Sequence, residues 1–258
     1  MSTAIFPEDE ASLSSAISDA AGPLQILGGG TRRIGRISGG QKLSTARLKG
    51  IVLYEPGALT LVAKTGTPVA DIEKALIAEN QRLAFEPMDH RILLGTPGTP
   101  TLGGVMAANV SGPRRIQVGA ARDFALGVSF VDGSGQLLKN GGRVMKNVTG
   151  YDLVKLMAGS WGTLGVLSEV ALKVLPVSET QATLKIHVSS WAQAVACMSA
   201  ALSTPFDVSG AATLQEADGA LGVIIRVEGF EASIRYRMTE LKTHLTKFGE
   251  IEEILSPW

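Results

Sequence analysis

Glycine is distributed very unevenly along this 258-residue chain, and that distribution constrains the fold more than any other feature of the sequence. Of 30 glycines, 25 precede Pro176 and only 5 follow it. Because glycine has no Cβ, it allows tight turns and close approach of backbone to backbone or to a ligand. The formal charge divides at the same place, +4 up to Pro176 and −4 beyond it. We therefore expect two domains, residues 1–176 and residues 177–258.

Charge, hydropathy and cysteine content exclude several classes of protein. The net charge of zero argues against nucleic acid as a partner. No apolar run reaches the ~18 residues that cross a bilayer, and the acidic start has no export leader, so we expect no transmembrane segment and a cytoplasmic location. Cys197 is the only cysteine, which excludes a disulfide framework and an iron–sulfur cluster in this chain. The three widely spaced histidines indicate no metal site.

The first glycine cluster follows a predicted strand over Leu24–Leu27. Gly28-Gly29-Gly30 would expose successive backbone amides to a pyrophosphate, with Arg32, Arg33 and Arg36 supplying positive charge. The alternative is a flexible surface hairpin, which suits an isolated glycine triplet equally well.

Two well-known phosphate motifs do not match this loop. In a Rossmann fingerprint that starts at Gly28, Arg33 stands where the third glycine belongs. In a P-loop that starts at Gly30, Arg36 and Ile37 replace the lysine and the serine or threonine. The sequence therefore supports neither NAD on a Rossmann unit nor an NTPase.

The second glycine-rich stretch covers residues 95–113, with a short helix of small residues expected over 104–108. It suits a long flat ligand that lies along the backbone, with hydrogen bonds from Thr101, Asn109 and Ser111. The alternative is a tightly packed turn and helix without a ligand.

The remaining pattern predicts an α+β protein. In the first domain Thr67 is expected to cap a helix with Pro68 at its first position. Apolar periodicity and turn residues there also predict a helix at 9–20, hairpins at 51–63 and 124–138, a helix at 152–158 and a strand at 165–175. Beyond Pro176 the predicted order is βαββαβ, that of a small ferredoxin-like domain. Trp161 and Trp191 are expected to be core or interface aromatics, and Cys197 a buried helical residue.

Several motifs together resemble one family. The chain is similar to the FAD domain of the vanillyl-alcohol oxidase/p-cresol methylhydroxylase flavoproteins, and within them to the FAD-binding subunits of bacterial glycolate oxidase. The resemblance lies in Leu27–Thr31, Thr101–Gly104 with Asn109 and Ser111–Arg115, Gly119–Asp123, Val144–Asp152 with Leu153, and Gly162–Val166. It implies a p-cresol methylhydroxylase-type FAD-binding domain of two α+β subdomains, followed by the smaller domain.

The resemblance also implies which residues bind FAD. The family's pyrophosphate loop corresponds to one group, the stretch along the flavin and ribityl chain to a second, and the segment at the adenine end to a third. These groups are Leu27, Gly28, Gly29, Gly30, Thr31 and Arg32; Thr101, Leu102, Gly103, Gly104, Ala107, Asn109, Ser111 and Gly112; and Gly165 with Val166. Members that attach flavin covalently have a histidine beside the first glycines, where this chain has Arg32 and Arg33. Noncovalent FAD is therefore expected.

The resemblance implies flavin-dependent oxidation of the CH–OH group of a small 2-hydroxy acid, together with a second FAD subunit and an iron–sulfur subunit. Contact with the inner membrane would be peripheral, through those partners. Only 82 residues follow Pro176, so we expect the substrate domain to be truncated or reduced. Arg114, Arg115 and Arg143 are candidates for holding a substrate carboxylate, although a surface role is favoured for each. The alternative function is a flavin-bearing or structural accessory subunit that relays electrons or organises the complex.

Overall fold

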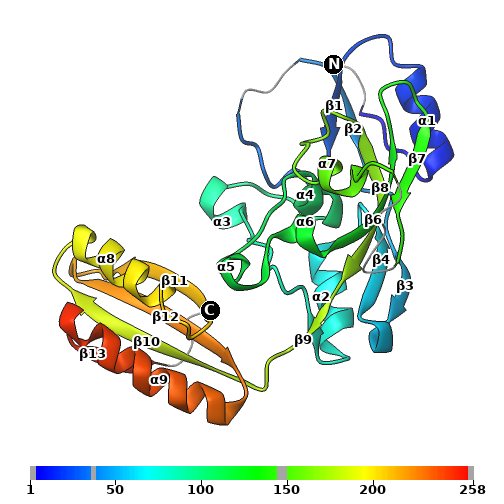
Figure 1. The fold of residues 1–258 in the computed structure, drawn as a ribbon. Helices are drawn as coiled ribbons and strands as arrows, with labels where there is room; N and C mark the ends of the chain where they lie inside the picture. The colour runs from blue at the N-terminus through cyan, green and yellow to red at the C-terminus, as the bar shows by residue number, and fades with distance from the viewer. Residues whose placement is uncertain (1–3, 36–38, 144–149, 255–258) are drawn as a thin grey trace. The chain divides into compact units, whose positions relative to one another are not determined.

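The computed structural model describes residues 4–35, 39–143 and 150–254. The chain divides into two compact units (Figure 1). Unit 1 comprises the described residues up to Gly112 together with Gly119–Pro176, and unit 2 comprises Pro113–Val118 with the described residues from Val177. Arg36 and the motif over Val144–Thr149 lie outside the described residues.

A five-stranded antiparallel sheet forms the centre of unit 1, with the strand order β3-β4-β8-β6-β7. Its central strand β8 (Val166–Lys173) is buried along most of its length and pairs with β4 on one side and β6 on the other. The other strands are β3 (Ile51–Glu55), β4 (Thr60–Lys64), β6 (Ala125–Val131) and β7 (Leu137–Gly141), and the 3₁₀ turn η1 (Pro56–Ala58) joins β3 to β4. Both predicted hairpins are confirmed.

A second, parallel pair of strands carries the first glycine loop. β1 (Leu24–Leu27) pairs with β2 (Gln41–Ser44), and helix α1 (Glu10–Ser18) begins at the side-chain cap Asp9. Buried side chains from α1 pack with Leu43, Val131 and Val166 in one apolar cluster. This packing fixes the end of β1 against the start of β8, where the pocket described below is found.

The helices of unit 1 are short, and one of their predicted caps is wrong. Helix α2 (Val69–Ile77) has Pro68 at its N-cap with no side-chain hydrogen bond. The Thr67 hydroxyl instead donates to the Lys64 carbonyl at 2.6 Å and accepts from the Gly50 amide at 2.9 Å. The remaining helices of this unit are α3 (Arg91–Leu94), α4 (Leu102–Ala107), α6 (Ala121–Phe124) and α7 (Leu153–Met157), and β5 (Gln81–Arg82) pairs with β9 (Leu175–Pro176).

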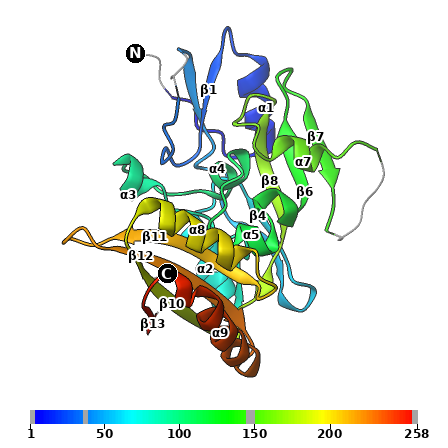
Figure 2. The ribbon, with the colours of Figure 1, turned by 60° about the vertical axis from the view of Figure 1, so that its left-hand side comes forward.

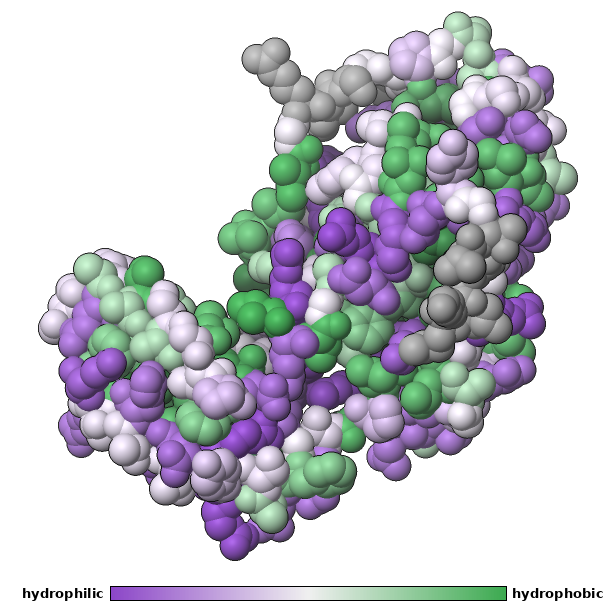
Figure 3. Space-filling view, viewed as in Figure 1, coloured by the Kyte–Doolittle hydropathy of each residue, from purple (hydrophilic) through white to green (hydrophobic). Residues whose placement is uncertain are grey.

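Unit 2 has the predicted βαββαβ order, drawn from yellow-green to red in Figures 1 and 2. Its antiparallel sheet has the strand order β11-β12-β10-β13. Alternate residues of β10 and β12 pack against α8 and α9, with Cys197 fully buried among them. Hydrophilic side chains predominate over the outward surface of α9 (Figure 3). The elements are β10 (Thr180–Val188), α8 (Trp191–Leu202), β11 (Val208–Gln215), β12 (Leu221–Gly229), α9 (Glu231–Leu245), η2 (Thr246–Phe248) and β13 (Ile251–Ile254).

Residues 113–118, which the sequence places in the first domain, group with unit 2. The buried guanidinium of Arg114 donates to both carboxylate oxygens of Glu228, at 2.8 and 3.0 Å. Helix α5 (Arg115–Val118) follows it. A bidentate buried pair fixes this segment to β12, and its partners are 114 positions apart in the sequence. Within the described ranges, no helix has the length and apolar character that crossing a bilayer requires.

Candidate functional site

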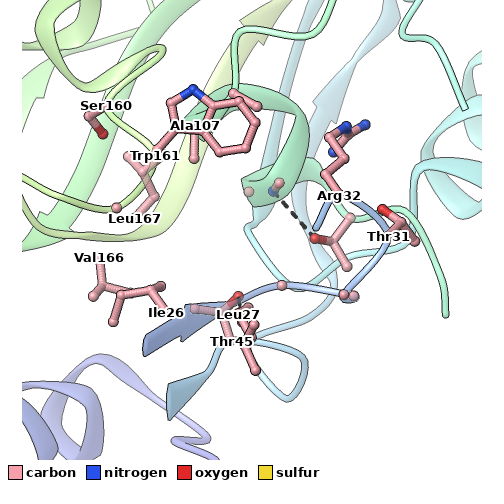
Figure 4. Close-up of a pocket in the computed structure, with 18 of the residues that line it drawn as sticks. Ile26, Leu27, Thr31, Arg32, Thr45, Ala107, Ser160, Trp161, Val166 and Leu167 are labelled. Carbon is pink, nitrogen blue, oxygen red and sulfur yellow. Dashed lines mark hydrogen bonds between the residues drawn. The ribbon is translucent and has the colours of Figure 1, made fainter. Parts of the chain in front are cut away.

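A pocket in unit 1 brings the two glycine-rich stretches together (Figure 4). It holds about 760 Å³ of space free of protein atoms, part of which is open to solvent. Twelve of the sixteen predicted residues line it: Leu27, Gly28, Gly29, Gly30, Thr31, Arg32, Thr101, Gly103, Gly104, Ala107, Gly165 and Val166. The pocket is therefore formed where the end of β1, helix α4 and the start of β8 meet.

The missing side chains of the first loop let backbone meet backbone. A Cβ built on Gly29 would lie 1.6 Å from the Thr99 carbonyl oxygen, so no other residue fits there. Gly30 has a φ of +73° and open space around it, which is the backbone region that glycine favours. Gly29 thus allows the two loops to meet, and Gly30 turns the chain along the pocket.

Arg32 is the one charged residue among the described residues that line the pocket. Its Nε donates to Nδ1 of His90 at 3.1 Å, and Nη2 donates to the Met88 carbonyl at 3.4 Å. Burial lowers the pKa of Arg32 and the nearby Asp89 carboxylate raises it, but a guanidinium remains charged at neutral pH. The pocket therefore contains one fixed positive charge. Arg33, predicted to add a second, is exposed and does not line it.

Helix α4 is held at the pocket by its N-cap. The Thr101 hydroxyl accepts from the Gly104 amide at 3.3 Å, the dashed line in Figure 4. A Cβ on Gly104 would lie 3.2 Å from Nη1 of Arg32, so the guanidinium lies close to the first turn of this helix. The predicted helix of small residues is confirmed, and it begins two residues earlier than expected.

Four predicted residues do not line this pocket, because the fold uses them elsewhere. Leu102 is fully buried in the core. The Asn109 side-chain oxygen accepts from the Arg122 amide at 2.9 Å, and the Ser111 hydroxyl accepts from the Ala121 amide at 2.8 Å. The Gly112 amide donates to the Phe85 carbonyl. The last three brace the loop after α4.

Seven lining residues were not predicted: Ile26, Thr45, Ala108, Ser160, Trp161, Gly162 and Leu167. Gly162 lies within the Gly162–Val166 motif, and the alternation of side chains along β1 and β8 could have indicated Ile26 and Leu167. Trp161 was predicted to be a core or interface aromatic, and its exposed fraction of 49% excludes the core. Thr45 and Ser160 carry no local signal for this site.

The pocket fits a long nucleotide cofactor on its own chemistry. The half-buried guanidinium of Arg32 beside a glycine loop suits a diphosphate, and the apolar Ile26, Val166 and Trp161 suit planar rings.

Comparison with known proteins establishes the class. A family model described as an FAD binding domain matches residues 2–141. The chain belongs to this family of FAD-binding domains, and FAD is its cofactor.

Particular relatives refine this result. The chain is 40% identical over 221 residues to glycolate oxidase subunit GlcE of Escherichia coli, covering 85% of this chain and 59% of that protein. It is 31% identical over 165 residues to glycolate oxidase subunit GlcD of Bacillus subtilis, covering 63% and 34%. It is also 33% identical over 152 residues to a D-lactate dehydrogenase of Anaerostipes hadrus, covering 58% and 30%. The chain thus spans less than two thirds of each of these relatives.

A solved structure supports the fold. That of alkyldihydroxyacetonephosphate synthase matches with a TM-score of 0.77 at 18% identity, over 98% of this chain and 52% of the other. Together with the family match, this confirms the predicted p-cresol methylhydroxylase-type fold class.

Proposed function

We propose that this chain is the FAD-binding subunit of a glycolate oxidase-like complex, which oxidises the CH–OH group of a small 2-hydroxy acid. The observation that carries the proposal is the pocket in which both glycine-rich stretches meet beside the half-buried Arg32. The similarity to two glycolate oxidase subunits supports the substrate class.

Noncovalent FAD would lie along the twelve predicted lining residues. Glycine backbone at Gly28–Gly30 and the Arg32 guanidinium would bind the diphosphate, and Gly165 with Val166 would meet the adenine end. Leu102, Asn109, Ser111 and Gly112 would act indirectly, by holding α4 and the loop after it. No histidine occurs among the described lining residues, which supports noncovalent binding.

Bound FAD supplies a ring that accepts a hydride from the substrate carbon. The chain's own contribution is to bind and orient that ring with α4 and to balance the diphosphate charge with Arg32. Of the three arginines predicted as carboxylate clamps, Arg114 already binds the Glu228 carboxylate. Arg115 and Arg143, the other two, are exposed. These positions favour substrate groups supplied from outside this chain.

We further propose a second FAD subunit and an iron–sulfur subunit as partners. The chain's own single cysteine cannot hold a cluster, and it suits a reducing cytoplasm. The second candidate function is a flavin-bearing accessory subunit that relays electrons or organises the complex. The protein carboxylate already bound to Arg114 favours that candidate.

The visible spectrum of the purified protein tests FAD binding, because bound flavin gives two absorption bands in the visible and near-ultraviolet. A colourless protein that gains no flavin on reconstitution would contradict the proposal. Anaerobic mixing with glycolate or D-lactate separates the two functions. Bleaching of the isolated chain supports catalysis on this chain, whereas bleaching only in the presence of partner subunits supports the accessory role.

A further inference from the structure

The guanidinium of Arg32 is held by the protein along one edge. Its Nε donates to Nδ1 of His90 at 3.1 Å, and its Nη2 donates to the Met88 carbonyl at 3.4 Å. These two acceptors lie 3.1 Å apart, so the edge that carries the parallel Nε–H and Nη2–H groups reaches both. At the other end, Nη1 lies beside the first turn of α4, 3.2 Å from the position of a Cβ on Gly104 (Figure 4). The protein therefore fixes one edge of the guanidinium and directs the other along the pocket.

These contacts orient Arg32 without neutralising it. Both acceptors are uncharged, and within the described ranges Arg32 forms no salt bridge. Asp89, the carboxylate next to His90 in the chain, is bound instead by Nε and Nη2 of Arg91, at 2.9 and 2.6 Å. A carboxylate on Arg32 would fix the guanidinium equally well, but it would also cancel the positive charge. An uncharged acceptor leaves that charge for an anionic ligand.

The contact with Arg32 also defines the tautomer of His90. A guanidinium keeps all its protons at neutral pH, so the Nδ1 that receives the Nε–H carries no proton. The proton of the neutral ring then lies on Nε2. The Met88 carbonyl, 3.1 Å from the same Nδ1, is bound by Nη2 of Arg32 and not by the imidazole.

We propose that His90 is a positioning residue, whose unprotonated Nδ1 aims the Arg32 guanidinium at the diphosphate of FAD and leaves its charge intact. His90 is 58 positions from Arg32 in the sequence and does not line the pocket, so it acts on the cofactor only through Arg32. This inference rests on the proposed FAD binding.

Three substitutions of His90 test this role when FAD is titrated into the flavin-free chain. His90→Leu removes the acceptor and should raise the Kd for FAD about five-fold. His90→Asn places a neutral oxygen where Nδ1 lies and should keep the Kd within about two-fold of wild type. His90→Asp binds the guanidinium but cancels its charge, and should raise the Kd about ten-fold. The matched control His244→Leu, at an exposed position of α9, should leave the Kd unchanged.

The coupling between His90 and Arg32 is measured by a double-mutant cycle. Arg32→Gln alone should raise the Kd for FAD about twenty-fold, because the diphosphate loses its cation. In that background His90→Leu should add no more than about 1.5-fold, since no guanidinium remains to be oriented. A further five-fold loss would mean that His90 acts independently of Arg32 and would overturn the proposal, as would wild-type affinity of His90→Leu. A wild-type chain that binds no FAD would instead overturn the proposed function.

Two measurements on the flavin-free chain separate positioning from structural support. The ¹⁵N chemical shifts of the His90 ring, identified by their loss in His90→Asn, should place the proton on Nε2. A proton on Nδ1 would mean that the ring donates to the Met88 carbonyl, and would overturn the proposal. The melting temperature of His90→Leu should lie within about 2 °C of wild type. A larger fall would mean that the residue supports the fold, which would also overturn the proposal.

Discussion

The two units are both α+β, but they use their residues in opposite ways. In unit 2, alternate side chains of β10 and β12 fill the space under α8 and α9. In unit 1, the loop after β1 lacks side chains, so that Gly29 packs directly on the backbone of Thr99 and a pocket remains beside it. High glycine content therefore marks places where backbone segments meet. The binding site is a consequence of that meeting, since both loops are needed to form its walls.

The largest effect on FAD binding should come from a side chain placed between Gly29 and the backbone of Thr99. Gly29→Val places a side chain where the Thr99 carbonyl lies 1.6 Å from the Cβ position, so the two loops must separate. We expect FAD retention to be abolished, measured as the ratio of flavin to protein after purification. Unit 2 should stay folded, with Cys197 resisting thiol reagents as in wild type.

The matched control is Gly57→Ala, where no atom lies within 4 Å of the new Cβ and φ is not positive. It should retain FAD fully. If Gly29→Val also retained FAD at the wild-type ratio, the assignment of the first loop would be wrong.

Unit 2 has a corresponding weak point that involves charge. Arg114→Ala leaves the Glu228 carboxylate buried, with 4% of its side chain exposed, and without this ion partner. Breaking a buried pair in this way costs about 3–5 kcal/mol of unfolding free energy. Urea unfolding, followed by the exposure of Cys197 to thiol reagents, measures the loss in unit 2.

The control for this change is Arg235→Ala, which removes an exposed i,i+4 pair with Glu231 and should cost only about 0.3–0.5 kcal/mol. Equal losses for the two variants would show that the 113–118 segment is not anchored to unit 2 by this pair.

The core of unit 2 should also respond to alkaline pH. Burial raises the pKa of the Cys197 thiol to about 11 from 9.0. The pKa of this thiol is higher in the folded state than in the unfolded state. The neutral buried thiol therefore contributes its full share of the unfolding free energy below pH 9, and this contribution is lost as the pH rises towards 11. The urea midpoint of unit 2 should fall across this range.

Cys197→Ala isolates this contribution, because it removes the titrating group. The variant should be less stable at pH 8 and show a smaller decrease in its midpoint between pH 9 and 11. Identical pH dependence in wild type and variant would exclude the thiol as the cause.

Much of this architecture follows from local sequence signals. Turn residues and apolar periodicity predict both hairpins of unit 1 and the βαββαβ order of unit 2. The resemblance to a family of FAD domains, in addition, predicts twelve of the lining residues. Local signals do not predict interactions between residues that are far apart in the sequence. The Thr67 hydroxyl binds Gly50 instead of capping its own helix, and Arg114 finds Glu228 only after folding. Trp161 has no periodic pattern that would distinguish a pocket wall from a core.

The smallest effect comes from a pair of helix caps, one in each unit. Thr101 caps α4 beside the pocket, and Ser190 caps α8 in unit 2, accepting from amides at 3.3 and 3.2 Å. Thr101→Ala and Ser190→Ala should each cost about 1 kcal/mol of unfolding free energy. Only Thr101→Ala should also weaken FAD binding. Fraying of α4 displaces a wall of the pocket, whereas fraying of α8 exposes part of the core of unit 2. Thr101→Ser, which keeps the hydroxyl, should restore both stability and affinity. If both alanine variants changed FAD affinity equally, the contrast between a unit that binds and a unit that packs would not hold.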